Sequence, residues 1–255
     1  MKTSTQKILN IIALIVVLTV NFLAVKLPIN GVTPGDISDR FHNEFAPAGI
    51  TFSIWSIIYG LIISVMIWQF RGNSVEKDDA ISKVSWFFIT NCFLNAAWIF
   101  SWHYLIFPLS VVIMLGILYT LVRLNTVISF EFMPNTPTRG LLKAAFGVYL
   151  GWICIATIAN VTVLLVSLNF NRFGLTETFW TGGMIGIGAL VASLTAWRLQ
   201  NLFIGLAVIW ALLGIIIRQN QLHADFTAIS WAAVTWMMPV VAAMIYSRTW
   251  KYLKF

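Results

Sequence analysis

The sequence contains little charge, and its charged residues lie mainly in short segments between long apolar ones. Charged residues make up 10% of the 255 residues, and all nine acidic residues lie outside the segments that are long enough to span a bilayer. Ion-coupled pumps and proton relays ordinarily place ionisable residues at membrane depth, where their cost is tolerated because they function there. The sequence therefore does not favour an ion-coupled pump or a proton relay.

Several catalytic and metal-binding patterns are also absent. The chain has no Cys/His metal spacing, no Ser-His-Asp constellation within reach of a shared pocket and no glycine-rich phosphate loop before a helix. Cys92 and Cys154 lie inside apolar segments, where we expect small packing residues. We expect His42, His103 and His223 in loops, so none is expected as a buried haem ligand. A conventional hydrolase or a nucleotide-dependent enzyme finds no support.

Long apolar runs dominate what is present. A hydrocarbon core about 30 Å thick requires roughly 20 residues of helix, and only helices or closed barrels satisfy their backbone in lipid. The period-two alternation of barrel strands is absent. The sequence therefore predicts an all-α membrane protein with eight transmembrane helices, near residues 8–27, 48–70, 84–103, 105–124, 141–167, 179–197, 201–218 and 227–247.

The basic residues indicate the orientation of the chain. If the helices alternate from a cytoplasmic N-terminus, the inner side holds Lys2, Lys7, Arg71, Lys77, Lys83, Arg123, Arg139, Lys143, Arg198, Arg248, Lys251 and Lys254. The outer side holds only Lys26, Arg40, Arg172 and Arg218. Cytoplasmic loops carry an excess of Lys and Arg, so we expect both termini in the cytoplasm. The net charge of +7 then reflects topology and attraction to an anionic lipid bilayer, and no nucleic-acid partner is expected.

The organisation predicted is five helices followed by three. The polar stretch 168–178 is the best internal break, which divides the chain into a five-helix bundle, 1–172, and a three-helix extension, 173–255. The longest loop, 28–47, carries three acids and forms either a lid or a solvated connector. In the sixth helix, Gly182, Gly186 and Ala189 form a small face for close packing in cis or in a homodimer.

Twelve tryptophans are the most informative residues. An aromatic belt at the headgroups explains those near helix ends, namely Trp68, Trp86, Trp102, Trp180, Trp197 and Trp250. Five others lie deeper: Trp55, Trp98, Trp152, Trp210 and Trp236. Helical spacing places polar and aromatic residues on three stripes, which are Trp55 and Tyr59; Asn91, Asn95, Trp98 and Trp102; and Tyr149, Trp152, Ala156 and Asn160. Such stripes line a ligand pocket or join neighbouring helices.

These stripes lie in segments that resemble the tryptophan-rich sensory protein family, TspO, whose mitochondrial relatives are called translocator proteins. The resemblance covers roughly residues 1–172. It rests on three motifs in the order of the family's second, third and fifth helices: FAPAGITFSIWSIIYG from Phe45 to Gly60, L-N-x-A-W from Leu94 to Trp98, and Y-L-x-W-x-x-x-A-T-x-x-N from Tyr149 to Asn160. The chain resembles a longer branch of the family with three additional helices.

The resemblance implies a five-helix bundle with a porphyrin-binding pocket on the side of the first loop. By resemblance, the pocket is lined by Trp55, Asn91, Asn95, Trp98, Trp152 and Ala156. Tyr59, Tyr149 and Asn160 join this candidate site because they lie on the same stripes. In some bacterial relatives two tryptophans, which match Trp55 and Trp152, are associated with light-dependent breakdown of protoporphyrin. Trp55 and Trp152 would be the catalytic residues if this chain were such an enzyme.

The chain also departs from the family pattern. The first loop lacks the usual tryptophan-containing element and keeps only Pro47 of a Pro-Pro pair, so contacts of that loop cannot be transferred. Ile99 and Phe100 replace two prolines that often follow the third-helix tryptophan. Val161 replaces the tyrosine of a sterol-recognition pattern, and sterol binding is therefore not predicted.

Together these features predict an integral membrane binding or sensory protein for a hydrophobic planar small molecule, a porphyrin or related tetrapyrrole, with a regulatory or carrier role. The sequence requires no cofactor and no metal, and a porphyrin enters as the ligand. Its carboxylates would seek Lys26 or Arg40 at the outer mouth. A facilitative transporter and a light-dependent porphyrin-degrading enzyme remain as alternatives.

Overall fold

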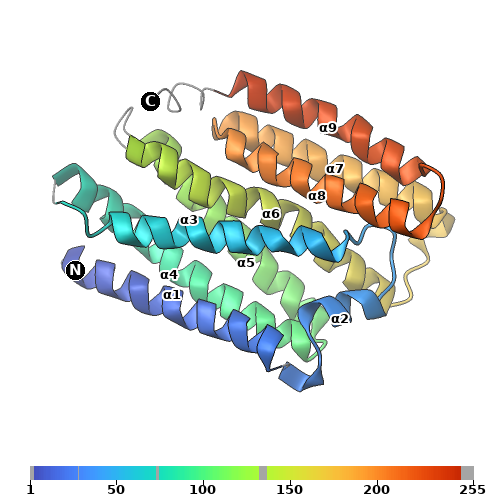
Figure 1. Ribbon diagram of the computed structural model, residues 1–255, viewed down its shortest axis with the longest axis horizontal. Coiled ribbons are helices and arrows are strands. Elements are labelled where there is room, and N and C mark those ends of the chain that lie inside the picture. Colours follow the sequence, from blue (N-terminus) through green and yellow to red (C-terminus); the bar gives the residue numbers. More distant parts are fainter. Residues whose placement is uncertain (1–2, 28, 73–74, 132–136, 248–255) are drawn as a thin grey trace.

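The computed structural model describes residues 3–27, 29–72, 75–131 and 137–247 (Figure 1). Eight helices in this part of the chain are long and apolar enough to cross a membrane, and these ranges contain no strand. The prediction of an all-α fold with eight spanning helices is confirmed. The spanning helices are α1 (Thr3–Lys26), α3 (Ile54–Trp68, preceded by the turn η2, Gly49–Ser53), α4 (Val75–His103), α5 (Phe107–Thr126, continued by η3, Val127–Glu131), α6 (Pro137–Ser167), α7 (Glu177–Arg198), α8 (Leu202–Leu222) and α9 (Ala228–Tyr246).

Several helices extend beyond the apolar segments that predicted them. The largest difference is in α4, which begins at Val75 rather than near residue 84. Its first turns are polar and include Asp78, which forms an ion pair with Lys7 of α1 at 3.0 Å. Hydropathy locates only the part of a helix that lies in hydrocarbon. The helical backbone hydrogen bonds continue into the interface where polar side chains find partners there, as Asp78 does.

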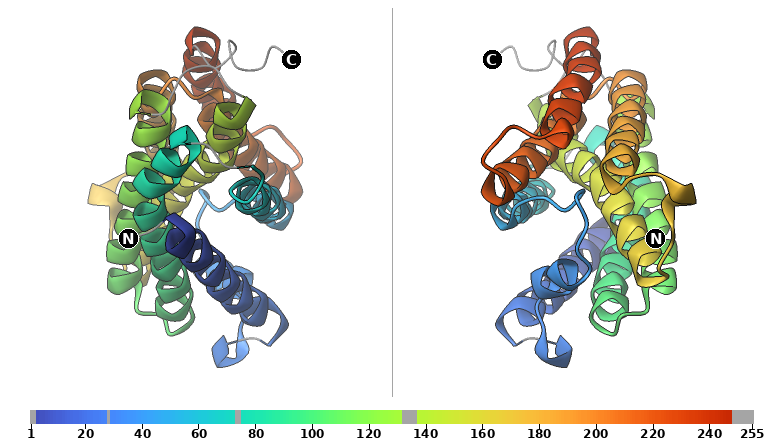
Figure 2. Two further views of the ribbon diagram at one scale, coloured as in Figure 1. Left: turned by 90° about the vertical axis from the view of Figure 1, so that its left-hand side faces the viewer. Right: turned by 90° about the vertical axis from the view of Figure 1, so that its right-hand side faces the viewer.

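Helix α6 lies at the centre of the bundle and packs against α3, α5 and α8. Helix α1 lies against α4 on one side, and α7, α8 and α9 pack together on the other (Figures 1 and 2). The extension joins the five-helix part chiefly where α8 meets α6. The predicted break at 168–178 contains the turn η4, Arg172–Gly174. Whether the two parts are separate domains stays a prediction.

Glycines allow these helices to approach closely. At Gly151 of α6, an added Cβ would fall on the backbone carbonyl oxygen of Ile204 in α8. On α7, a Cβ at Gly186 would meet the indole of Trp236 in α9 at 2.7 Å, and Ala189 is fully buried. Small residues of this kind let membrane helices pack at short distance. The small face predicted on α7 is therefore used in cis.

The start of α1 and the end of α9 lie at the same end of the bundle, and α2 (Pro34–Arg40) lies at the other (Figure 1). Buried cations at the first of these ends bond to carbonyls near helix C-termini. Lys77 donates to the carbonyl of Trp68, and Lys143 donates to that of Gln200. Helix C-termini carry partial negative charge and unpaired carbonyls, which accounts for these contacts.

Of the basic residues expected on the inner side, Lys2, Arg248, Lys251 and Lys254 lie outside the described residues, as does Trp250. The side of the membrane on which the termini lie stays a prediction.

Candidate functional site

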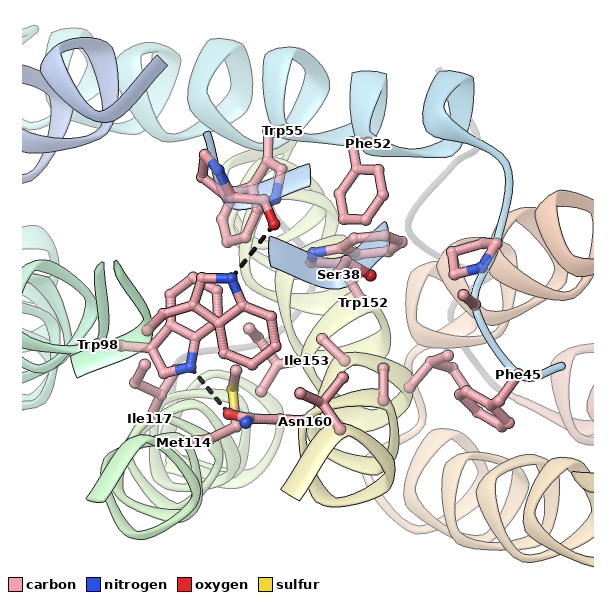
Figure 3. A pocket seen from close by; sticks show the side chains of 18 of the residues that line it. Ser38, Phe45, Phe52, Trp55, Trp98, Met114, Ile117, Trp152, Ile153 and Asn160 are labelled. Atoms are coloured by element: carbon pink, nitrogen blue, oxygen red, sulfur yellow. Dashed lines mark hydrogen bonds between the residues drawn. The ribbon is translucent and has the colours of Figure 1, made fainter. Parts of the chain in front are cut away.

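A cavity lies between α3, α4, α5 and α6 beneath the first loop (Figure 3). The empty space among its lining residues is about 860 Å³, a figure that includes the part open to the exterior. Among the described residues, its lining contains no charged side chain. The lining residues are Pro34, Ser38, Asn43, Phe45, Ala46, Pro47, Phe52, Trp55, Asn95, Trp98, Trp102, Met114, Ile117, Trp152, Ile153, Ile155, Ala156, Ala159, Asn160 and Val163.

Aromatic rings form two groups in this lining. The indole of Trp55 lies edge-on to that of Trp152, with ring centroids 6.3 Å apart, and Phe52 lies edge-on to Trp152 at 5.7 Å. On α4, Trp98 stacks on Trp102 at 5.3 Å. Trp102 is buried, so the prediction that it belongs to an interfacial belt is wrong. The first loop, between α1 and α3, covers Trp102, whose indole donates to the carbonyl of Pro34 at 3.2 Å.

Two of the three amides in the lining, those of Asn95 and Asn160, are engaged by other helices. Asn95 accepts a hydrogen bond from Asn21 of α1 at 2.9 Å and donates one to the hydroxyl of Tyr149 in α6 at 2.8 Å. Asn160 accepts from the indole of Trp98 at 2.9 Å and donates to Ser110 of α5 at 2.8 Å. These bonds hold α1, α4, α5 and α6 in register, so their first role is to position the cavity walls.

The cavity brings together six of the nine residues predicted for the site. These are Trp55, Asn95, Trp98, Trp152, Ala156 and Asn160. The other three, Tyr59, Tyr149 and Asn91, do not line it.

The excluded residues support the walls. Tyr59 stacks on Trp55 with centroids 5.5 Å apart, and Tyr149 lies edge-on to Trp55 at 5.6 Å. Asn91 donates instead to the hydroxyl of Thr120 in α5 at 2.8 Å. Spacing along one helix could not separate these residues, because the neighbouring helix decides which part of a stripe is covered.

The first loop packs over the cavity. The short helix α2 is held at its start by a capping box in which Thr33 and Asp36 exchange hydrogen bonds. The backbone and side-chain hydrogen bonds from Thr33 lower the pKa of the Asp36 carboxyl. Ile37 and Phe45 are fully buried. The loop therefore covers the cavity, as the lid alternative predicts, and is not a fully solvated connector.

A family profile described as TSPO-like protein matches residues 7–246. This chain belongs to the TSPO-like protein family. The match includes α7, α8 and α9 as well as the five-helix part, and so extends beyond the motifs that carried the resemblance. No match is found among curated proteins or among solved structures. Family membership and eight apolar helices make this an integral multi-pass membrane protein of the sensory or binding kind.

Several lining residues of this TSPO-like protein were not predicted. Met114 and Ile117 of α5 are ordinary apolar residues, and nothing in their spacing distinguishes them from lipid-facing neighbours. Ser38, Asn43 and Phe45 come from the first loop. The signal available was the run Phe45-Ala46-Pro47 directly before the second apolar segment, because a large apolar residue in a polar loop indicates a buried loop.

Two polar atoms of this TSPO-like protein are buried near the aromatic groups without a hydrogen-bond partner among the described residues. They are the indole nitrogen of Trp152 and the hydroxyl of Tyr59. A buried indole N–H ordinarily has an acceptor, so the N–H of Trp152 is available to donate a hydrogen bond to a ligand that carries an acceptor atom.

The prediction that His103 lies in a loop is wrong. It is the last residue of α4 and is fully buried, with Nδ1 at 2.7 Å from the carbonyl oxygen of Ile99. Helix α4 extends to this position because its last turn is covered by the first loop, where Asn30 donates to the His103 carbonyl at 3.1 Å. His103 is not among the residues that line the cavity.

Replacement of Asn95 by leucine is expected to lower the free energy of unfolding by about 1–2 kcal/mol. The change removes two interhelical hydrogen bonds and leaves half-buried Asn21 of α1 and buried Tyr149 of α6 without this partner. Unfolding in mixed detergent micelles, followed by circular dichroism, measures the difference. Ser64→Ala is the control, because exposed Ser64 bonds only to Gly60 of its own helix. Equal midpoints for both variants would contradict the role of Asn95 as a tie between helices.

Proposed function

We propose that this protein binds a hydrophobic planar small molecule, a porphyrin or related tetrapyrrole, in the cavity beneath the first loop, and acts as a sensor, carrier or regulator. The observation that carries the proposal is an uncharged cavity lined by four indoles from three helices, Trp55, Trp98, Trp102 and Trp152. Aromatic faces favour flat ring systems through stacked and edge-on contacts.

The remainder of the lining sets the chemistry of the ligand. Burial of a carboxylate in an uncharged pocket is costly without a cationic partner. A porphyrin would therefore place its ring system among the indoles and keep its carboxylate edge toward the mouth. Arg40, at the exposed end of α2 in the loop that covers the cavity, is the cation that we propose for that edge. Ring nitrogens or an oxygen substituent could accept from the indole of Trp152.

A fluorescence titration tests this proposal. Purified protein in detergent is titrated with protoporphyrin, and quenching of tryptophan emission is expected to saturate with a Kd of about 1 μM or tighter. N-acetyltryptophanamide in the same detergent corrects for absorption by the porphyrin. Trp86→Phe should leave the Kd unchanged, because Trp86 is 53% exposed and does not line the cavity. Quenching that is linear in porphyrin and no greater than that of the free indole would overturn the proposal.

The edge-on pair Trp55 and Trp152 supports a second candidate, light-dependent breakdown of the bound porphyrin. Its signature is loss of the porphyrin absorption band under illumination, abolished by the double change Trp55→Phe and Trp152→Phe while binding persists. If the absorption band is stable under illumination, the second candidate is excluded and the proposed function is binding without breakdown. Solute flux in proteoliposomes without any porphyrin affinity would instead favour a transporter.

A further inference from the structure

Helix α8 contacts the backbone of the segment that covers the cavity. We define residues 44–52 as the roof segment, since four of them, Phe45, Ala46, Pro47 and Phe52, line the cavity. Along α8, the indole of Trp210 donates to the carbonyl of Thr51 at 2.8 Å. The carbonyl of Gly214 accepts from Ala48 N–H at 2.9 Å, and the amide of Gln219 donates to the carbonyl of Glu44 at 3.2 Å.

These three contacts are spread along α8 from Trp210 to Gln219 and reach the roof segment from its first residue almost to its last. Residues 44–48 are irregular and residues 49–52 belong to the short turn η2, so several peptide groups of the segment need partners from elsewhere in the structure. Of the α8 residues that provide them, Gln219 is buried, and its side-chain oxygen accepts from Thr227 at the start of α9 at 3.3 Å. Its amide orientation is thereby fixed, with the donor directed to the roof segment.

Steric fit reinforces the hydrogen bonds. A Cβ at Gly214 would overlap the side chain of Thr51, which is itself buried. Only glycine lets the helix approach the roof segment so closely. Helix α7 adds a contact, because the carboxylate of Glu177 accepts from Glu44 N–H at 3.2 Å. Both backbone groups of Glu44 are thus held by the C-terminal helices.

We propose that Trp210, Gly214 and Gln219 are positioning residues that hold the roof segment closed over the cavity, so that the C-terminal helices control ligand entry and exit. The kinetic part of this inference rests on the proposed function, whereas closure of the roof segment can be measured without any ligand. We call the contacts of Trp210, Gly214 and Gln219 with the roof segment the clamp. A ligand can enter or leave only when the roof segment opens, so a weaker clamp raises the rate constants for both association and dissociation.

The ligand-free test measures access to the roof segment. Half-buried Ala46 is changed to cysteine, and its reaction with a water-soluble maleimide is followed in the full-length protein. The buried native Cys92 and Cys154 supply a background that the chain without Ala46→Cys measures. Two variants weaken the clamp, Gly214→Ala by steric overlap and Gln219→Glu by loss of the donor in an isosteric side chain. Gln219→Glu is expected to increase the labelling rate about tenfold, the effect of losing one net hydrogen bond on a local opening equilibrium. Gly214→Ala is expected to increase it at least as much, because the overlap with Thr51 forces the roof segment away from α8.

Gly183→Ala is the matched control, because nothing lies within 4 Å of a Cβ added there. It should label at the rate of the parent protein. If Gly214→Ala fails to fold, Gln219→Glu and Trp210→Phe, which removes only the indole N–H, decide the outcome. Unchanged labelling in the folded clamp variants overturns the inference.

Stopped-flow quenching with protoporphyrin then tests the kinetic consequence. We expect both rate constants to rise several-fold in Gln219→Glu, and dissociation to rise more, because contacts from Phe45 and Phe52 are weakened. An unchanged thermal midpoint separates this effect from general destabilisation. If the parent protein does not bind protoporphyrin, the proposed function fails. The labelling rates still test whether α8 holds the roof segment closed. If it binds and the rate constants do not change, control of exchange by α8 is wrong.

Discussion

Replacement of Gly151 by alanine is expected to lower the free energy of unfolding by about 3 kcal/mol. The added methyl group would overlap the backbone carbonyl of Ile204 and lie 2.9 Å from Cβ of Ala207 in α8. A backbone atom cannot rotate away, so α6 and α8 must separate along their contact, and overpacking of this kind costs about 1–3 kcal/mol or more. Unfolding in mixed micelles, monitored by circular dichroism, measures the change.

Gly60→Ala is the control for this substitution, because nothing lies within 4 Å of the added Cβ. Alanine there is expected to be neutral or slightly stabilising, since it has the higher helix propensity. Equal unfolding midpoints for the two variants would show that the contact between α6 and α8 tolerates separation. Gly151→Ala should also disturb the cavity, because the next residue, Trp152, lines it.

Replacement of Trp152 by alanine is expected to weaken protoporphyrin binding about 100-fold, or about 3 kcal/mol. Trp152 is buried, and it contacts both Phe52 and Trp55, so its removal takes away a wall of the cavity and the support of two other rings. Truncation of a buried aromatic residue at the centre of a binding surface typically costs 2 kcal/mol or more. The fluorescence titration described above, corrected for the lost tryptophan, measures the Kd.

Trp152→Phe separates the ring from its polar atom. Phenylalanine keeps an aromatic surface but removes the indole N–H, which has no partner among the described residues. An affinity between those of the parent protein and the alanine variant is expected, with a loss of about tenfold if the ligand accepts a hydrogen bond there. Trp86→Ala, on an exposed surface, is the control for tryptophan removal. If Trp152→Ala binds as tightly as the parent, the ligand does not occupy this cavity.

The sequence predicted the tryptophan face of the site well because that face depends on local geometry. Trp152, Ala156 and Asn160 lie one or two turns apart on α6, so any helix places them on one side. The motifs also named Trp55 and Trp98, and both line the same cavity; that they bind a ligand stays a prediction. The roles of the amides remained open, since a cavity wall and a bond between helices require the same kind of side chain at the same depth.

The first loop was the least predictable part. Its three acids suggested a solvated connector as readily as a lid, yet Phe45 is buried and lines the cavity. Its position depends on Gln219 and Gly214, more than 160 residues further along the chain. The burial of Trp102 and His103 follows from the same cover, because the loop encloses the end of α4.

By itself, the sequence determined that the chain crosses the membrane as eight helices and that three of them carry aromatic stripes. In lipid the backbone must satisfy its hydrogen bonds within each segment, so apolar length and helical spacing are sufficient to predict both. Only the tertiary structure decided which stripe residues face the cavity and that α8 holds its roof. Those outcomes depend on which distant segment supplies the partner for each polar group and on where glycine allows close approach.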